Sequence, residues 1–183
     1  LAGRADVSVT TAGGVATLPA FTYIAPSTVS SVLPARGPAP IATTLTITGT
    51  GFIPGDTIVQ FGEGTTPYYG AQSVVVDSPT TLRVTTPAGM PPMTYALFVT
   101  TTGGRTIAPG AYTAVSPPQI ATVAPASGLP AGGTLVAVIG ANFVAGDVRV
   151  TIGGIDATSV VVVSPSSVEA RTPASAAGVR DVV

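Results

Sequence analysis

The residues of this sequence that could support catalysis or metal binding are its eight carboxylates, and they are scattered along the chain. They are Asp6, Asp56, Glu63, Asp77, Asp147, Asp156, Glu169 and Asp181. His and Cys are absent, so the commonest general base, imidazole metal ligands and thiol nucleophiles are missing. A calcium site needs six to eight oxygens, commonly from clustered acids, and the sequence has no Asp-x-Asp run. We therefore predict no catalytic residue, no metal ligand, no cofactor and no enzymatic activity.

Two glycine-flanked acids and two glycine pairs each have two interpretations. Gly55-Asp56 and Gly146-Asp147 occupy equivalent places in two similar segments and could be ligands in a metal-binding loop. Asp after Gly more often forms a turn in which the carboxylate accepts hydrogen bonds from nearby backbone N–H groups, and this interpretation is favoured. Gly132-Gly133 and Gly153-Gly154 carry no Lys and precede no helical pattern, so they are expected to be tight β-turns and not phosphate-binding loops.

The composition excludes several classes of protein. Charged residues make up only 8% of the chain and the net charge is −1, so there is no basic surface to bind nucleic acid. No apolar run approaches the ~20 residues that cross a bilayer, so no membrane span is predicted in this segment. The hydrophobic content of 45% and the mean hydropathy of +0.57 indicate a folded chain. The lack of Cys does not identify the compartment.

The sequence repeats itself with a period near 90 residues, and this repeat is its most informative feature. Pro34, Gly49 and Phe52 recur 91 positions later. Their counterparts are Pro125, Gly140 and Phe143. In addition, Thr11-Ala12-Gly13-Gly14 resembles Thr101-Thr102-Gly103-Gly104, 90 positions later. This period is longer than a solenoid repeat of about 20 to 50 residues and indicates small domains in series.

The pattern within one repeat is that of short β-strands. Thr44–Thr48 alternates strictly, with Leu45 and Ile47 on one face, and Thr57–Phe61 alternates in the same way. Val74–Val76 is apolar on both faces and is predicted to be a central strand. Further strands are expected at Leu82–Val84, Tyr95–Thr100 and Ala111–Val115. About seven strands in about 90 residues predict an immunoglobulin-like sandwich, and 18 Pro with 22 Gly argue against long helices.

The second repeat carries the landmarks of a known family in their usual order. They are Ile120-Ala-Thr-Val-Ala-Pro125, Gly132-Gly133-Thr134, Ile139-Gly140-Ala141-Asn142-Phe143, Val150-Thr-Ile-Gly153-Gly154, Ser164-Pro165, Arg171-Thr172-Pro173 and Gly178-Val-Arg-Asp181-Val182. This set resembles the IPT/TIG domain, an immunoglobulin-like module of plexins, certain transcription factors and bacterial surface proteins. The first repeat departs from the family pattern at Thr50-Gly51-Phe52, where a Gly-x-Asn-Phe run is usual. The resemblance implies an all-β fold of tandem sandwiches and an extracellular or cell-surface location.

The repeat boundaries predict one complete domain between two partial ones. Residues 26–115 form the complete IPT/TIG-like domain, and residues 1–25 supply the C-terminal strands of a preceding repeat. Residues 116–183 supply the N-terminal part of a further domain. We expect strands equivalent to 1–25, from the following segment or from a neighbouring copy, to complete it. Proline-rich junctions such as Ser116-Pro117-Pro118 predict semi-rigid couplings between domains.

Two sets of residues are candidate contacts. Tyr68 and Tyr69 lie in a five-residue insertion of the first repeat, and paired tyrosines on a loop suit sugar stacking or a protein interface. The alternative is that they pack over the end of the sandwich. Leu135 and Ile139 stand where the first repeat has threonines, so a neighbouring domain or subunit is expected to cover them. The alternative is a slightly apolar free surface.

These observations favour a non-catalytic structural module of an extracellular stalk, sheath or filament that self-associates end to end. Its expected partners are other copies of itself or adjacent repeats, with a surface glycan or protein as a further candidate. The alternative function is an adhesin or carbohydrate-binding module that uses the Tyr68/Tyr69 loop. DNA binding, as in the transcription factors that the resemblance includes, is disfavoured because basic loops are lacking.

Overall fold

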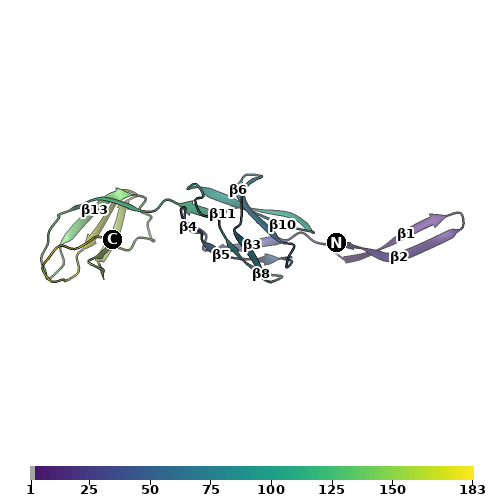
Figure 1. Ribbon diagram of the computed structural model, residues 1–183, viewed down its shortest axis with the longest axis horizontal. Helices are drawn as coiled ribbons and strands as arrows, with labels where there is room; N and C mark the ends of the chain where they lie inside the picture. Colours follow the sequence, from purple (N-terminus) through teal and green to yellow (C-terminus); the bar gives the residue numbers. More distant parts are fainter. Residues whose placement is uncertain (1–2) are drawn as a thin grey trace. The chain divides into compact units, whose positions relative to one another are not determined.

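The computed structural model describes residues 3–183, which form only strands and turns (Figure 1). The chain divides into two compact units: unit 1 ends at Val115, and unit 2 is Ser116–Val183. The described residues contain no α-helix, and hence none long and apolar enough to cross a membrane. The expected all-β class is confirmed.

Unit 1 contains a hairpin followed by two sheets. The hairpin consists of β1 (Gly3–Thr11) and β2 (Gly14–Tyr23), which form a two-stranded sheet of their own. The later strands are β3 (Thr28–Leu33), β4 (Arg36–Pro38), β5 (Thr44–Thr50), β6 (Ile58–Glu63), β7 (Thr66–Gly70), β8 (Ser73–Ser78), β9 (Thr81–Thr85), β10 (Thr94–Thr101) and β11 (Gly104–Val115). One sheet has the order β3-β5-β9-β8 and the other the order β4-β11-β10-β6-β7.

The alternation of apolar and polar residues places the core of unit 1 as the sequence predicts. Leu45 and Ile47 of β5 are fully buried, while the threonines that alternate with them are exposed. Val59 and Phe61 of β6 are buried in the same way. Successive side chains of a strand point to opposite faces, so each of these strands contributes one apolar face to the space between the sheets.

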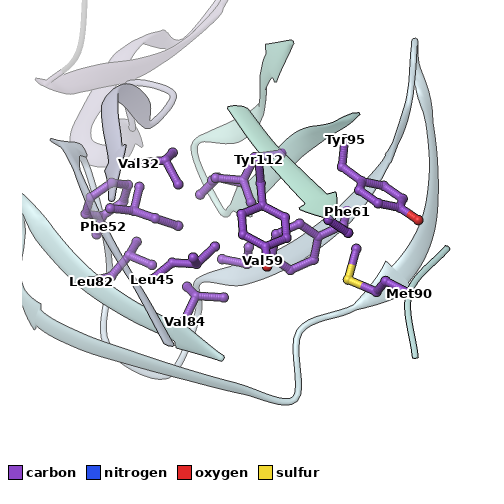
Figure 2. Packing of buried hydrophobic residues seen from close by; sticks show 14 of the residues in the cluster. Val32, Leu45, Phe52, Val59, Phe61, Leu82, Val84, Met90, Tyr95 and Tyr112 are labelled. Carbon is purple, nitrogen blue, oxygen red and sulfur yellow. The ribbon is translucent and has the colours of Figure 1, made fainter. Parts of the chain in front are cut away.

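The centre of this core is an aromatic contact between strands of the second sheet. The rings of Phe61 and Tyr112 lie edge to face with centroids 5.9 Å apart, and both side chains are at most 1% exposed. Figure 2 shows them beside Val59, with Leu45 and Val84 from the other sheet nearby. Tyr112 comes from β11, so the hairpin formed by β10 and β11 supplies an essential part of the core.

Three details of unit 1 differ from the prediction. Val74–Val76 belongs to β8, which is an edge strand and not a central one, and Val75 is 46% exposed. The segment around Tyr68 and Tyr69 is strand β7, paired with β6, and not a loop. Nine strands follow the hairpin where about seven were expected, because β7 and the three-residue β4 were not foreseen. Each of these details depends on pairing with distant strands, which local patterns do not report.

Unit 2 repeats the first sheet of unit 1 in the same register. Its strands are β12 (Gln119–Ala124), β13 (Leu135–Ala141), β14 (Thr151–Ile152), β15 (Ile155–Asp156), β16 (Thr158–Ser164) and β17 (Ser167–Arg171). The sheet order is β12-β13-β17-β16. Val138 pairs with Val123 and Val168, as Ile47 pairs with Val32 and Leu82 in unit 1. The repeat is therefore structural as well as sequential.

The glycine and phenylalanine of the repeated landmark have a steric explanation. A Cβ added to Gly49 would lie 1.9 Å from the carbonyl oxygen of Thr28 and 2.8 Å from Cζ of Phe52. At Gly140 the corresponding distances, to Gln119 and Phe143, are 1.8 Å and 2.8 Å. In both units the phenylalanine ring covers a close approach of two strands that only glycine permits.

At Gly51 the first repeat has glycine where the family pattern has asparagine, and the backbone conformation explains this substitution. Gly51 has φ +74° and Asn142, at the equivalent position, has φ +63°. Glycine and asparagine are the residues that adopt this left-handed conformation most readily. The side-chain amide of Asn142 also donates a hydrogen bond of 2.9 Å to the carbonyl oxygen of Pro117. Gly51 thus supplies the backbone geometry of the usual asparagine without its side-chain bond.

Candidate interaction surfaces

The acids remain apart in three dimensions. Within residues 3–183, no three acidic side chains come close enough together to hold a metal ion. Asp56 accepts a hydrogen bond of 2.7 Å from the backbone N–H of Thr102. The carboxylate therefore caps the distant turn between β10 and β11, and not the nearby backbone N–H groups that the favoured interpretation predicted. Gly153 and Gly154 form the turn between β14 and β15, both with positive φ.

Two acids form exposed ion pairs. Asp77 accepts two hydrogen bonds of 2.8 Å from Arg83, and Asp156 accepts one of 2.6 Å from Arg149. These hydrogen bonds, aided by the attraction between opposite charges, lower the pKa of both carboxyl groups. Exposed pairs of this kind add little stability, and they are best seen as solvated surface features.

The two candidate tyrosines lie on opposite faces of β7. Tyr69 is half-buried, and its ring packs edge to face on Tyr95 with centroids 5.9 Å apart. Tyr68 is 57% exposed and lies at an irregularity in the pairing of β6 with β7. The alternation of β7 thus turns Tyr69 toward the core and presents Tyr68 to solvent. Of the predicted pair, Tyr68 is the side chain available to a partner.

Leu135 and Ile139 lie on the outer face of the sheet of unit 2. They are 48% and 41% exposed, and they alternate along β13 with the buried Val136 and Val138. On the edge strand β16, which is separated from β13 by β17, Val161 and Val163 are also exposed. The equivalent outer face of unit 1 carries Thr44, Thr48 and the ion pair of Asp77 with Arg83. Unit 2 therefore has the more apolar outer face.

The hairpin of β1 and β2 has one apolar and one polar face, which the sequence analysis did not single out. Cross-strand pairing puts Ala5 beside Phe21, Val7 beside Leu18 and Val9 beside Ala16. Tyr23 joins this face, because its ring contacts that of Phe21 with centroids 4.9 Å apart. We call these residues the apolar hairpin face: Ala5, Val7, Val9, Ala16, Leu18, Phe21 and Tyr23. Its larger side chains are 47% to 64% exposed.

The apolar hairpin face repeats the core face of the hairpin formed by β10 and β11. Leu97 pairs with Ala108 and Tyr95 with Tyr112, with an irregularity between the two pairs. The β1–β2 hairpin has an irregularity at the corresponding place, between the pairs Val7–Leu18 and Ala5–Phe21, but β2 has one residue fewer there than β11. Phe21 therefore holds the position of Tyr112. The two faces differ in burial. The side chains of the β10–β11 hairpin that face the core are at most 1% exposed, whereas the larger side chains of the apolar hairpin face are 47% to 64% exposed. The buried set is Tyr95, Leu97, Val99 and Tyr112.

Unit 2 contains an apolar groove beside its sheet. The groove has a volume of about 750 Å³ and is lined by β12, the turn after it and the segment 172–182. Its lining includes Gly128, Val136, Ile152 and Val182. Three of these occupy the positions of Gly37, Leu45 and Phe61, 91 residues earlier. In unit 1 that space holds Tyr112, whose hydroxyl lies 2.6 Å from where a Cβ of Gly37 would be.

The second sheet of unit 2 is represented, within the described residues, by short pieces. Strands β14 and β15 have two residues each, and Ile152 forms a single bridge with Val182. This bridge reproduces the pairing of Phe61 with Leu97 in unit 1. Phe61 and Leu97 are fully buried, whereas Ile152 and Val182 are only partly buried. Residues 116–183 contain no counterpart of β11.

Comparisons with known proteins give one family match and several similar proteins. The family model described as the IPT/TIG domain matches residues 27–114 and 118–183. The human protein Fibrocystin-L is 38% identical over 80 residues, which are 44% of this chain and 2% of that protein. Among solved structures, the Plexin A4 extracellular region aligns with a TM-score of 0.44 and 23% identity, over 97% of this chain and 15% of that one.

A second solved structure comes from a bacterium. It is SGBP-B, from a complex xyloglucan utilization locus in Bacteroides uniformis. It aligns with a TM-score of 0.36 and 23% identity, over 87% of this chain and 44% of that one. The chain thus spans only a small part of the curated relative and less than half of either solved structure.

Proposed function

Because this chain belongs to the IPT/TIG domain family, we propose that it is a non-catalytic structural repeat module of an extracellular stalk, sheath or filament. In this proposal it associates end to end with other copies of itself or with adjacent repeats of the same chain. The proposal accounts for a chain that builds the same four-stranded sheet twice in the same register.

The observation that carries the proposal is the apolar hairpin face. Leu18, Phe21 and Tyr23 are each more than half exposed, although the same positions of the β10–β11 hairpin face the core. Burying a side chain of this size is worth about 1.5–3 kcal/mol. Exposed apolar surface of this kind is typical of protein interfaces. An interaction that covers this face therefore has a substantial driving force.

The extracellular location rests on two supporting points. The family resemblance includes plexins and bacterial surface proteins, which present such modules outside the cell. The sequence has 8% charged residues and no Lys, so its surface is poor in charge. The test is labelling of intact, unpermeabilised source cells with an antibody against this chain. Labelling only after permeabilisation would contradict the location.

End-to-end association is tested with the purified 183-residue polypeptide. We expect its mass, measured by light scattering after size-exclusion chromatography, to increase with concentration. Negative-stain electron microscopy should then show linear particles with a repeat of two units. A polypeptide that stays monomeric at every concentration would argue against self-association.

A second candidate function is glycan binding, which the exposure of Tyr68 favours. An aromatic ring on an exposed strand offers an apolar face for a sugar ring and a hydroxyl for hydrogen bonding. The test is a glycan array with the purified chain, followed by Tyr68→Ala. Ile58→Ala is the matched control, because Ile58 is similarly exposed, at 59%, on the adjacent strand β6. Loss of binding in Tyr68→Ala alone supports this function, and no binding by the original chain removes it.

The outer face of unit 2 is a further proposed contact. Leu135 and Ile139 are outward and apolar where unit 1 has threonines, and we propose that an adjacent domain or copy covers them in the assembled material. Replacing both with threonine should weaken assembly without changing the fold. Unchanged assembly of this variant would assign these side chains to free surface.

A further inference from the structure

We propose that the outer face of unit 2 binds the same face of a second copy across a two-fold axis, with Glu169 of each copy paired to Arg171 of the other. This inference rests on the proposed contact at Leu135 and Ile139 and commits that contact to one occupant. The residues of the face lie on three neighbouring strands. They are Leu135, Ala137 and Ile139 on β13, Glu169 and Arg171 on β17, and Val161 and Val163 on β16.

Comparison with unit 1 shows how the charges of this face differ. In unit 1, Asp77 on the edge strand β8 pairs with Arg83 on β9 across the outer face. The residues 86 positions later are Val163 and Glu169. Unit 2 therefore has an apolar side chain at the edge and a carboxylate on a central strand in place of the ion pair. Val163 is 59% exposed and extends the apolar part of the face.

Glu169 and Arg171 are the two charged members of this face. Both are exposed and lie two residues apart on β17, so their side chains leave the same side of the strand. Within residues 3–183, Glu169 takes part in no ion pair. Arg171 donates a hydrogen bond of 2.9 Å to the carbonyl oxygen of Gly133, and its guanidinium has further N–H donors. A complementary partner presents a base opposite Glu169 and an acid opposite Arg171.

A second copy of the same face supplies this arrangement. A two-fold axis that lies between the two sheets and crosses β17 between Glu169 and Arg171 turns the strand end for end. Glu169 of each copy then faces Arg171 of the other, and both charge pairs form. Sheets packed face to face lie about 10 Å apart, a gap that a glutamate and an arginine side chain span together. The contact is isologous and therefore closes at two copies.

The strands of the repeat itself leave this face uncovered. Unit 1 has both of its sheets, and the second sheet packs on the inner face of the first, against Leu45 and Ile47. On the outer face of unit 1, Thr44 and Thr48 are exposed, and the side chain of Arg83 is 56% exposed. The outer face is thus a free surface in a repeat that has both sheets, and its partner comes from outside the repeat.

The dimensions of the face predict a weak dimer in which charge matching is decisive. Four strands about 4.8 Å apart and about five residues long, at about 3.3 Å per residue, measure about 19 Å by 17 Å. A face of this size belongs to the low end of specific interfaces. An unmatched charge between the sheets retains its cost of desolvation without a compensating attraction. Mispairing at β17 therefore outweighs the modest apolar contact around it.

Charge reversal tests the reciprocal pairing. Glu169→Arg places two arginines on β17, and Arg171→Glu places two glutamates there. In a dimer of either variant like charges face each other, which is strongly unfavourable. We therefore expect the Kd for dimerisation, measured by sedimentation equilibrium of the 183-residue polypeptide, to rise about tenfold or more. An equal mixture of the two variants should dimerise about as tightly as the original chain, because arginines of one variant face glutamates of the other.

Two further variants control this test. Glu63→Arg changes the net charge as Glu169→Arg does, but on the exposed side chain of β6 in unit 1, and it should leave Kd unchanged. Val163→Asp introduces the residue that unit 1 has at the equivalent edge position, which that sheet accommodates. It should raise Kd about tenfold, because it places a charge within the apolar part of the contact. An unchanged Kd in Val163→Asp would overturn the face-to-face contact.

The outcomes separate this inference from the proposed function. Weaker dimers of both charge variants, with recovery in the mixture, support the inference and self-association together. Association of both variants like that of the original chain would overturn the Glu169–Arg171 contact and leave end-to-end association through other surfaces. Loss of the dimer without recovery in the mixture would overturn the two-fold arrangement. An original chain that stays monomeric at every concentration would refute both this inference and self-association.

Discussion

Replacement of Gly49 by alanine is the sharpest test of how the repeated landmark works. The added Cβ would lie 1.9 Å from the carbonyl oxygen of Thr28, whereas ordinary contacts begin at 3.4 Å. The strands β3 and β5 would have to separate by about 1.5 Å at this point. Overpacking of this kind typically costs about 1–3 kcal/mol. Because the clash is with backbone, which cannot rotate away, we expect a cost of about 3 kcal/mol.

The expected change in melting temperature follows from the size of unit 1. For a domain of 60–100 residues, each kcal/mol shifts Tm by about 4–8 °C, so Gly49→Ala should lower Tm by about 12–24 °C. Tyrosine fluorescence is a selective assay, since the chain has no Trp and unit 2 has no Tyr. The signal therefore follows the unfolding of unit 1 and its hairpin without contribution from unit 2.

Two variants serve as controls for this prediction. Gly70→Ala lies on β7, where an added Cβ meets nothing within 4 Å, and it should change stability by less than about 0.5 kcal/mol. Gly140→Ala makes the equivalent clash in unit 2 and should leave the tyrosine transition in place while lowering that of unit 2, followed by circular dichroism. If Gly49→Ala melts within a few degrees of the original chain, the steric explanation of the landmark is wrong.

Three further predictions concern the core, the ion pair and the outer face. Phe61→Ala should destabilise unit 1 by about 3–5 kcal/mol, and Ile152→Ala should cost unit 2 clearly less because that side chain is only partly buried; equal losses in urea unfolding would show that burial does not set the difference between the two positions. The pKa of Asp77 is lowered, so its contribution is present above the unfolded pKa of about 3.9 and is lost as pH falls through the folded pKa. The small difference in urea midpoint between the original chain and Asp77→Asn should thus shrink toward zero at about pH 2, and a difference that persists there would rule out the ion pair as its source. Leu135→Thr with Ile139→Thr should change the stability of unit 2 by less than about 0.5 kcal/mol; a larger loss by circular dichroism would show that these side chains pack inward.

Local patterns were sufficient to predict the fold class and the buried face of most strands. The inward positions of Leu45, Ile47, Val59 and Phe61 follow from a period of two, which any strand with one apolar face displays. The place of a strand within its sheet follows from distant partners, and here the prediction failed. Val74–Val76 is as apolar as a central strand, yet β8 pairs only with β9 and lies at the edge.

For the candidate surfaces too, local patterns predicted some features, and others depended on pairing with distant strands. Exposure of Leu135 and Ile139 was predictable, because comparison with the threonines of the first repeat identifies the outer face. The separation of Tyr68 from Tyr69 was not, because it required knowing that their segment is a strand paired with β6. The apolar hairpin face could have been found from the alternation of Ala5, Val7 and Val9. Its second strand hides the pattern, since the irregularity before Phe21 breaks the period of two.

The amino-acid sequence alone determined that this chain is built from repeated all-β units with sparse charge and scattered carboxylates, because composition, alternation and repetition are properties of the chain itself. Which of its apolar residues are covered depends on the packing of the folded chain. The side chains of one hairpin are buried in unit 1 by a facing sheet, and the matching side chains of β1 and β2 are exposed. Burial depends on what lies opposite a strand, and that is a relation between distant segments which no local pattern contains.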